Sequence, residues 1–452
     1  MTVDTDAGLQ RRALSLARTR LSPMVVSSVG LVSGKAVSML LGFLFWLGAA
    51  RMFPERVVGL TSGVISSIML CVLLAVLGIG SAFIVLFPAH LRRLHRLLDT
   101  AISLAICSGM AGAGLFLLLA AGVFEELNVV VHAPLFALLF VAMGALGTVQ
   151  VLLDQVSMAQ RRGHDVLSRN VVNGLVTILP LPILHAVMPS AGAFELFTCW
   201  VGGVLCASLL AWSQLHRTAG SYSFHPRIDK RIGADLLRIG LPNQALTVAE
   251  RAPGLVLPVV IVELLSPEIN AYWYSAWMMA WAAFVIPVSI GIAMFAESAH
   301  DPASLRRQVR SSLVSALVMG AGTATAIAVL APFVLALLGP SYAQAATEPL
   351  RILVWAVVPS VCTQVYYSVC RSRDRLVEAV ATGAVGGTVG VGAVAVAGMD
   401  VGLVGMAAAW VASQTVLGVW SLWRLRVLLN RESGRDEVPA SGGESGSGAV
   451  PT

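Results

Sequence analysis

Long apolar stretches separated by short polar segments recur from one end of the chain to the other. About 20 predominantly apolar residues in an α-helix are enough to cross the ~30 Å hydrocarbon core of a membrane. The pattern therefore predicts an all-α fold, a polytopic membrane protein with about twelve transmembrane helices. These helices are expected at residues 24–50, 57–88, 99–122, 133–160, 169–188, 193–216, 239–264, 269–299, 308–338, 350–371, 376–397 and 402–424.

Lysine and arginine are distributed unequally between the two sides of these predicted helices. Of the 30 residues of these two types, only Arg51, Arg56 and Arg351 fall in loops on one side. Lys35 and Arg251 lie within predicted helices, and all the others fall on the opposite side, Arg169 and Arg371 among them. Basic loops stay cytoplasmic during insertion. We therefore expect both termini in the cytoplasm, and the net charge of +6 requires no nucleic-acid partner.

Composition supports a membrane protein without a catalytic domain. The chain is 57% hydrophobic and 12% charged, whereas soluble domains are about one quarter charged. The six cysteines lie in apolar stretches without a CxxC pair, so we interpret them as small buried side chains rather than metal ligands. The loops expected at 123–132 and 338–349 are too short for an extracytoplasmic domain. We expect no enzyme activity and no cofactor.

The longest polar connection lies near the middle of the chain and divides it into two halves of six predicted helices. Within it, Ile228, Ile232, Leu236 and Ile239 recur at helical spacing, which predicts an amphipathic helix at the membrane surface. The tail is rich in Gly, Ser and acidic residues and is expected to be disordered. The predicted organisation is a cytoplasmic segment (1–23), a six-helix bundle (24–216), an amphipathic linker (217–238), a second six-helix bundle (239–426) and a tail (427–452).

The two halves share a weak repeat. In each half the first helix carries a cation, and a Pro-Glu pair follows it: Lys35 precedes Pro54, and Arg251 precedes Pro267. A cation at similar depth in both lead helices fits a transporter with internal repeats and a site at their interface. We therefore expect two pseudo-symmetric bundles.

Lys35 lies in "VSGKAVSMLLGF", inside a long apolar run. It follows Pro23 by about 12 residues, and hence lies ~18 Å deep at ~1.5 Å per residue. Three interpretations remain open for a lysine at this depth. Its ammonium group reaches the surface by snorkelling, pairs with a carboxylate of a neighbouring helix, or meets an anionic ligand in a water-filled cavity.

Three other charged residues lie within predicted helices. Glu250 and Arg251 are adjacent, so their side chains point ~100° apart and each needs a partner elsewhere. Arginine offers a fork that matches phosphate oxygens, so Arg251 is a candidate for substrate binding, and Glu250 for coupling or an ion pair. Asp154 is a second candidate for coupling or pairing. It either pairs with Lys35 or remains a shallow, hydrated carboxylate.

Three tryptophans follow one helix face in "AYWYSAWMMAWAAF". Trp273, Trp277 and Trp281 are spaced at i, i+4 and i+8. We interpret Trp273 as part of the interfacial aromatic belt. Trp281 lies ~12 Å deeper at ~1.5 Å per residue, where Trp281 and Trp277 either pack in the core or stack on a sugar ring.

Three segments resemble a known family. They are similar to segments of polysaccharide (O-antigen-type) flippases. The three segments are "LFWLGAARMFPERVVGLTSGVISSIMLCVLLAVLGIGSAF" (44–83), "MAQRRGHDVLSRNVVNGLVTILPLPIL" (158–184) and "SPEINAYWYSAWMMAWAAFVIP" (266–287). These flippases belong to the multidrug/oligosaccharidyl-lipid/polysaccharide exporter superfamily. The resemblance implies two helical bundles around a central cationic cavity that opens alternately to each side. The implied substrate is a polyprenyl-diphosphate-linked oligosaccharide, moved from the cytoplasmic to the outer leaflet.

The resemblance also implies roles for individual residues. Lys35 and Arg251 match positions where such flippases carry cavity cations, whereas Glu250 stands where an Asp is common. The alternative within the superfamily is a cation-coupled multidrug exporter, which typically needs an Asp in the first helix, where this chain has Lys35. Three driving forces remain open: the membrane potential alone, or coupling to H⁺ or to Na⁺. Expected partners are the glycan substrate, membrane lipids and other polysaccharide-assembly membrane proteins.

Arginine greatly outnumbers lysine, which occurs only as Lys35 and Lys230. This bias is typical of a GC-rich genome, so the expected location is a bacterial plasma (inner) membrane.

Overall fold

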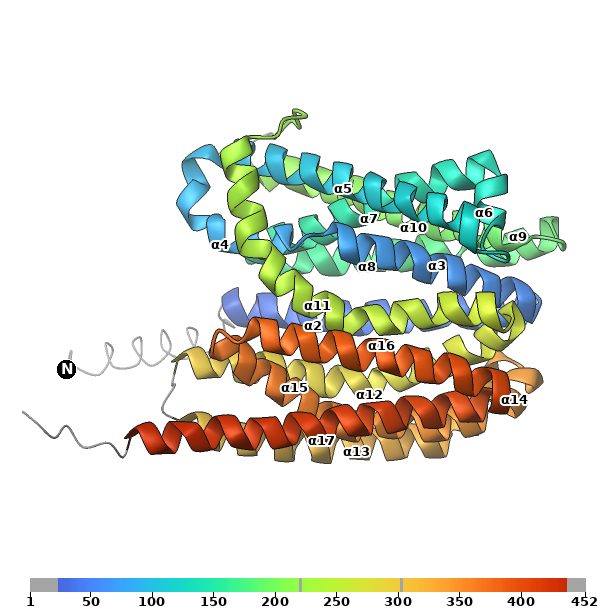
Figure 1. Ribbon diagram of the computed structural model, residues 1–452. Helices are drawn as coiled ribbons and strands as arrows, with labels where there is room; N and C mark the ends of the chain where they lie inside the picture. The colour runs from blue at the N-terminus through green and yellow to red at the C-terminus, as the bar shows by residue number, and fades with distance from the viewer. Residues whose placement is uncertain (1–22, 219–221, 301–303, 437–452) are drawn as a thin grey trace, which may run out of the picture.

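The structure of the chain is a computed structural model that describes residues 23–218, 222–300 and 304–436 (Figure 1). Every regular element in this part of the chain is helical. Eleven spans are long and apolar enough to cross a membrane, and α2, which contains the apolar segment Val37–Met52, brings the number to twelve. The predicted all-α fold with about twelve membrane helices is therefore confirmed.

Each span consists of one helix or of two consecutive helices. In the first half they are α2 (Pro23–Met52), α3 (Glu55–Ala75) with α4 (Ile79–Leu86), α5 (Leu94–Val123), α7 (Pro134–Ala159), α8 (Gly163–Ile178) with α9 (Pro180–Val187), and α10 (Ala193–Thr218). In the second half they are α11 (Lys230–Leu264), α12 (Pro267–His300), α13 (Leu305–Leu338), α14 (Pro340–Leu353) with α15 (Val357–Ser372), α16 (Leu376–Val401) and α17 (Leu403–Asp436). The short α6 (Val129–His132) connects α5 to α7.

The spans form two bundles, as the sequence predicts. Helices α3, α5, α7, α8 and α10 lie together in the upper part of Figure 1, and α12, α13, α15, α16 and α17 lie together in the lower part. Helix α2 packs mainly against α8, and α11 packs against both α16 and α3. Helix α11 therefore connects the bundles in space as well as along the chain.

The connection between the bundles differs from the predicted surface helix. Its apolar positions Ile232 and Leu236 are buried, the second completely (0% exposed), and they pack with residues of α5. They belong to the first turns of α11, which begins at Lys230. The apolar residues have the predicted helical spacing, but the neighbouring helix α5 covers them instead of lipid. A sequence pattern of this kind does not distinguish the two surroundings.

Two side chains fix the start of α11. The Asp229 carboxylate caps the helix by accepting bonds from the N–H groups of Ile232 (3.2 Å) and Arg231 (3.0 Å). The bond from Ile232 lowers the pKa of this carboxyl group. The Tyr222 hydroxyl donates to Asp99 of α5 (2.5 Å), and burial raises its pKa. The connection is thus fastened to the first bundle.

Two other expectations need correction. Residues 338–349, predicted as a loop, form the end of α13 and most of α14, where Tyr342 and Ala346 are buried. The polar side chains of this segment made it look like a loop, although its apolar positions have helical spacing. Helix α17 continues to Asp436, into the segment 427–452 that was predicted as disordered. Residues 1–22 and 437–452 lie outside the described part of the chain.

The two Pro-Glu turns meet at one end of the molecule. Glu55 starts α3 after Pro54, and Pro267 starts α12. A Cβ atom added at Gly59 would lie 1.6 Å from the carbonyl oxygen of Pro267, so only glycine permits this approach of the helices. Arg56 pairs with Glu268 across the bundles (3.3 Å). We call this end, on the right of Figure 1, the closed end.

Further polar contacts join the bundles at the closed end. Asn270 of α12 donates to the Gly59 carbonyl (2.8 Å) and to Ser62 (2.9 Å). Near the end of α11, the Glu263 carboxylate accepts bonds from the N–H groups of Glu125 (2.8 Å) and Leu127 (2.7 Å). The end that carries the arginine-rich loops, which we call the basic end, lies opposite.

Candidate functional site

The largest described cavity, of about 590 Å³, lies between the two bundles. We call it the central cavity. Its walls come from α3 and α4, α7, α11 and α12. From the first bundle they include Leu73, Val76 and Gln155, which lie in the halves of α3 and α7 toward the basic end. Nearer the basic end α11 also contacts the first bundle, where Gln244 donates to the Leu73 carbonyl (2.5 Å). The lining residues of the first bundle place the cavity on the side of the basic end.

The lining of the central cavity is mostly apolar, with a few uncharged polar groups such as Gln155, Asn243 and Thr247. Among the described residues that line it, Arg251 alone carries a charge. The Arg251 side chain is exposed, and no hydrogen bond or ion pair holds its guanidinium group within the described part of the chain. An arginine remains charged at any accessible pH. The cavity therefore presents a free cation on an apolar wall.

A smaller cavity of about 110 Å³ lies within the second bundle, between α11, α12, α15 and α17. We call it the side cavity. Arg251, Gly254, Trp277 and Trp281 line both cavities. The two spaces therefore meet at Arg251. Glu250 and the side chains of Gln364 and Gln414 also line the side cavity.

Glu250 is not free. Its carboxylate oxygens accept bonds from one Arg371 nitrogen of α15 at 3.1 and 3.3 Å, and both side chains are largely buried. The adjacent Arg251 makes no ion pair with Glu250, as expected from the ~100° between neighbouring side chains on a helix, although its charge also acts on this carboxylate. The pair leaves Glu250 neutralised and Arg251 available.

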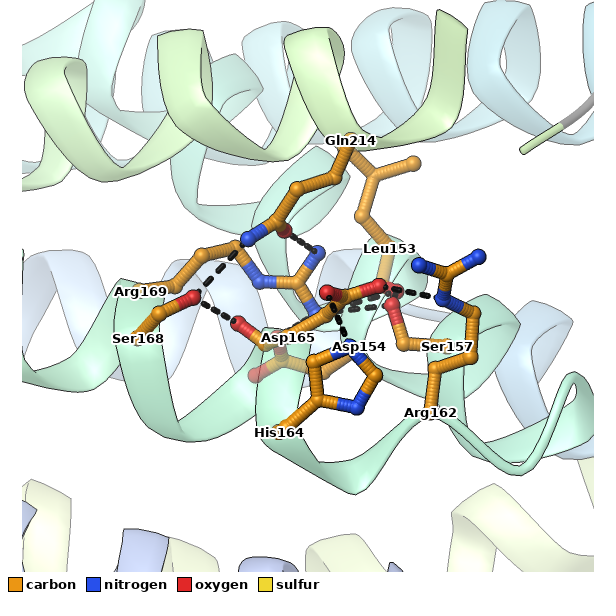
Figure 2. Close-up of polar contacts among 9 residues, drawn as sticks. All are labelled: Leu153, Asp154, Ser157, Arg162, His164, Asp165, Ser168, Arg169 and Gln214. Carbon is orange, nitrogen blue, oxygen red and sulfur yellow. Dashed lines mark hydrogen bonds and ion pairs between the residues drawn. The ribbon is translucent and has the colours of Figure 1, made fainter. Parts of the chain in front are cut away.

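Asp154 lies in a separate cluster that joins α7, α8 and α10 (Figure 2). Its carboxylate lies 2.8 Å from the Arg169 guanidinium group, which is only 2% exposed. The same group donates to Ser157 (2.9 Å) and to Gln214 (3.2 Å). Gln214 in turn donates to Ser168 (2.8 Å). Neither described cavity above includes Asp154 in its lining.

These positions correct two sequence interpretations. Asp154 has Arg169 as an ion-pair partner, which the sequence analysis did not consider. Arg169, which the sequence analysis places in a basic loop, is buried because α8 begins already at Gly163. The Lys35 side chain lies outside the described residues, although α2 includes its backbone. Its role stays a prediction.

The three tryptophans of α12 have different surroundings. Trp273 is completely buried (0% exposed) and stacks on Trp277, so its assignment to an interfacial belt was wrong. Trp277 is 9% exposed and packs edge to face against Trp410 of α17. Trp281, at 36%, is the one with an open surface. Of the two stacking candidates, Trp277 is thus mainly a packing residue and Trp281 is accessible to a ligand.

Sequence reasoning missed Arg169, Arg371, Gln364 and Gln414. For Arg169 a signal existed: an acidic residue in one predicted helix and a basic residue early in the next can meet across a tight turn. The two glutamines lie on different helices far apart in the sequence, and no local pattern brings them together.

Comparison with known proteins identifies the fold. No family model and no curated protein matches the chain. Among solved structures, it is similar to a multidrug resistance MATE family transporter of the MOP superfamily. The inward-facing conformation has a TM-score of 0.69 at 15% identity, over 89% of this chain and 96% of that one. The outward-facing conformation has a TM-score of 0.62 at 15% identity, over 91% and 98%.

A third similar structure is a MOP superfamily transporter from Pyrococcus furiosus, with a TM-score of 0.66 at 15% identity, over 91% of this chain and 96% of that one. It is described as having a binding pocket of reverse polarity that suggests a different function. At these identities the likeness defines the fold. The chain is a multi-pass membrane protein with the two-bundle fold of MATE transporters.

Proposed function

We propose that the protein is a transporter that moves a polyprenyl-diphosphate-linked oligosaccharide from the cytoplasmic to the outer leaflet by alternating access. The observation that carries this proposal is the unpaired Arg251 guanidinium group in the central cavity. A diphosphate loses its hydration when it leaves water, and a guanidinium fork replaces those bonds with strong charge-assisted ones. A cationic solute would meet repulsion from the same group.

The shape of the molecule fits loading from one side. The bundles are joined at the closed end by contacts such as Arg56–Glu268 (3.3 Å), and the cavity lies toward the basic end. If the basic end is cytoplasmic, as the distribution of arginine predicts, the cavity faces the leaflet where the substrate is made. The lipid tail then stays in the bilayer while the charged part crosses within the protein.

Other residues complete the proposal. Lys35, on the lead helix of the first bundle, is the proposed second cation of the cavity. Glu250 and Asp154 are the proposed sites of coupling to H⁺ or Na⁺, each next to an arginine that a bound ion would compete with. The proposed location is a bacterial plasma membrane with both termini in the cytoplasm.

A second candidate function is cation-coupled multidrug export. It is favoured by the fold, which the chain shares with multidrug resistance transporters, and by the Glu250 carboxylate in an aromatic side cavity. The ion pair of Glu250 with Arg371 weakens this candidate, because the carboxylate would have to leave Arg371 to bind a cationic drug.

Reconstitution of the purified protein separates the two functions. Vesicles that contain it are expected to move a fluorescent polyprenyl-diphosphate-linked oligosaccharide between leaflets, measured as the fraction that a membrane-impermeant reagent can reach. The same vesicles are expected not to export a cationic fluorescent dye. Vesicles without protein are the control. Dye export without movement of the glycolipid would establish the second function and exclude the first.

A further inference from the structure

The side cavity contains two amide groups with no function in the fold. Gln364 of α15 and Gln414 of α17 line it, and neither side chain makes a hydrogen bond within the described part of the chain. Both side chains are partly buried. Their amide atoms are open to the cavity, because neither belongs to the described buried side-chain atoms that lack a partner. The partner is therefore water or a ligand in the cavity.

The chemistry of these groups restricts the ligand. Each amide offers two N–H donors and one carbonyl acceptor, which suits hydroxyl groups, because a hydroxyl both donates and accepts. Trp281, in the same lining, has an exposed indole surface against which the C–H face of a sugar ring can pack. Arg371 pairs with Glu250 (3.1 Å), so an organic cation would have to displace Arg371 to bind this carboxylate.

The position of the side cavity links it to the proposed phosphate group. Arg251 lines both cavities, so a phosphate bound there has the side cavity on one side and the central cavity on the other. Gly254, one turn along α11 from Arg251, sets the distance between this helix and Trp277. A Cβ atom there would lie 2.9 Å from Cζ2 of Trp277, so the indole rests directly on the helix backbone.

From this arrangement we infer that the side cavity is a binding subsite for the sugar ring that is attached directly to the phosphate. Gln364 and Gln414 bind its hydroxyl groups, Trp281 packs on its face, and Arg251 holds the phosphate. The inference rests on the proposed function and deepens it, because it names the part of the substrate that the second bundle recognises. The described residues of the first bundle contribute nothing to the lining of this subsite.

Quenching of tryptophan fluorescence in the purified, detergent-solubilised full chain tests the subsite. The probes are glucose 1-phosphate and inorganic phosphate. The wild-type protein is expected to bind glucose 1-phosphate more tightly than phosphate. The double variant Gln364→Leu/Gln414→Leu is expected to lose about tenfold in affinity for glucose 1-phosphate, the effect of removing one to two ordinary hydrogen bonds, and to keep its affinity for phosphate.

Gln150→Leu is the matched control, because Gln150 is also a half-buried glutamine of a membrane helix but lines neither cavity. It should leave the affinity for glucose 1-phosphate unchanged. Retained phosphate binding by the double variant shows that it is folded, and Gln364→Asn, which only shortens the side chain, provides a milder second variant with a smaller loss. Equal affinities of wild type and both variants for glucose 1-phosphate would overturn the inference. So would tighter binding of uridine monophosphate than of glucose 1-phosphate, which would indicate a nucleobase site.

The outcomes also distinguish this inference from the proposed function. Sugar-dependent binding without glycolipid movement in vesicles would leave the subsite in place and refute the transport of the lipid-linked substrate. Glycolipid movement together with unchanged binding by the glutamine variants would refute the subsite and leave the proposed function in place.

Discussion

Replacement of Arg251 by alanine is expected to lower movement of the lipid-linked oligosaccharide about tenfold or more, without loss of membrane insertion. The exposed guanidinium group has no partner among the described residues, so its removal leaves no orphaned acid. What is lost is its bonding to the phosphate. Bonds to charged groups contribute about 1.5–3 kcal/mol, which corresponds to a factor of ten to a hundred or more. The vesicle assay for leaflet exposure measures the effect.

Two variants serve as controls for this prediction. Arg351→Ala also removes one arginine, but Arg351 pairs with Glu348 on the surface (2.7 Å) and lines neither cavity. It should transport like the wild type. Arg251→Lys keeps the charge and loses the fork, so intermediate transport is expected. Wild-type rates for Arg251→Ala at equal protein content would remove Arg251 from the mechanism.

The second large effect is expected on stability, from Arg169→Ala. Arg169 is 2% exposed and lies 2.8 Å from Asp154. Its removal leaves the carboxylate in the bundle without a cation and also breaks the bonds to Ser157 and Gln214. Asp154 is itself 30% exposed, so we expect a loss somewhat below the about 3–5 kcal/mol that follows when one member of a fully buried pair is removed. Thermal unfolding in detergent should therefore begin at a clearly lower temperature.

The pair can be tested further by removing both charges. The double variant Asp154→Leu/Arg169→Leu should unfold at a higher temperature than Arg169→Ala, because no unpaired charge remains. Arg162→Ala is the neighbouring control, since Arg162 also pairs with an acid (Asp165, 2.8 Å) but is more exposed. It should have a small effect, about 1 kcal/mol or less. Equal unfolding temperatures for Arg169→Ala and Arg162→Ala would show that the buried pair does not stabilise the first bundle.

The number and order of the membrane helices could be predicted from the sequence because they depend on local quantities. Hydropathy over about 20 residues locates a membrane helix without knowledge of its neighbours. The arginine-rich segments are found between these helices in the same local way. The two Pro-Glu pairs were likewise visible, and in the structure they begin α3 and α12. What the sequence did not reveal is that these turns meet each other at the closed end.

Burial and pairing could not be predicted because they depend on contacts between distant segments. Glu250 meets Arg371 from a helix more than 100 positions away, and the sequence analysis had assigned Arg371 to a loop. The i, i+4, i+8 spacing correctly put the three tryptophans on one face, but only packing decides that Trp273 is buried and Trp281 is open. The same holds for Ile232 and Leu236, whose amphipathic spacing is satisfied by α5 and not by lipid.

The central claim is that a free guanidinium group makes the central cavity selective for anionic lipids. Equilibrium binding to the purified protein tests it most directly, with a polyprenyl diphosphate as the anion and tetraphenylphosphonium as the lipophilic cation. The wild type should prefer the diphosphate by at least about tenfold, as expected for bonds to a charged group, and Arg251→Glu should lose or invert this preference. Equal binding of the cation by the wild type, or an unchanged preference in Arg251→Glu, would contradict the claim.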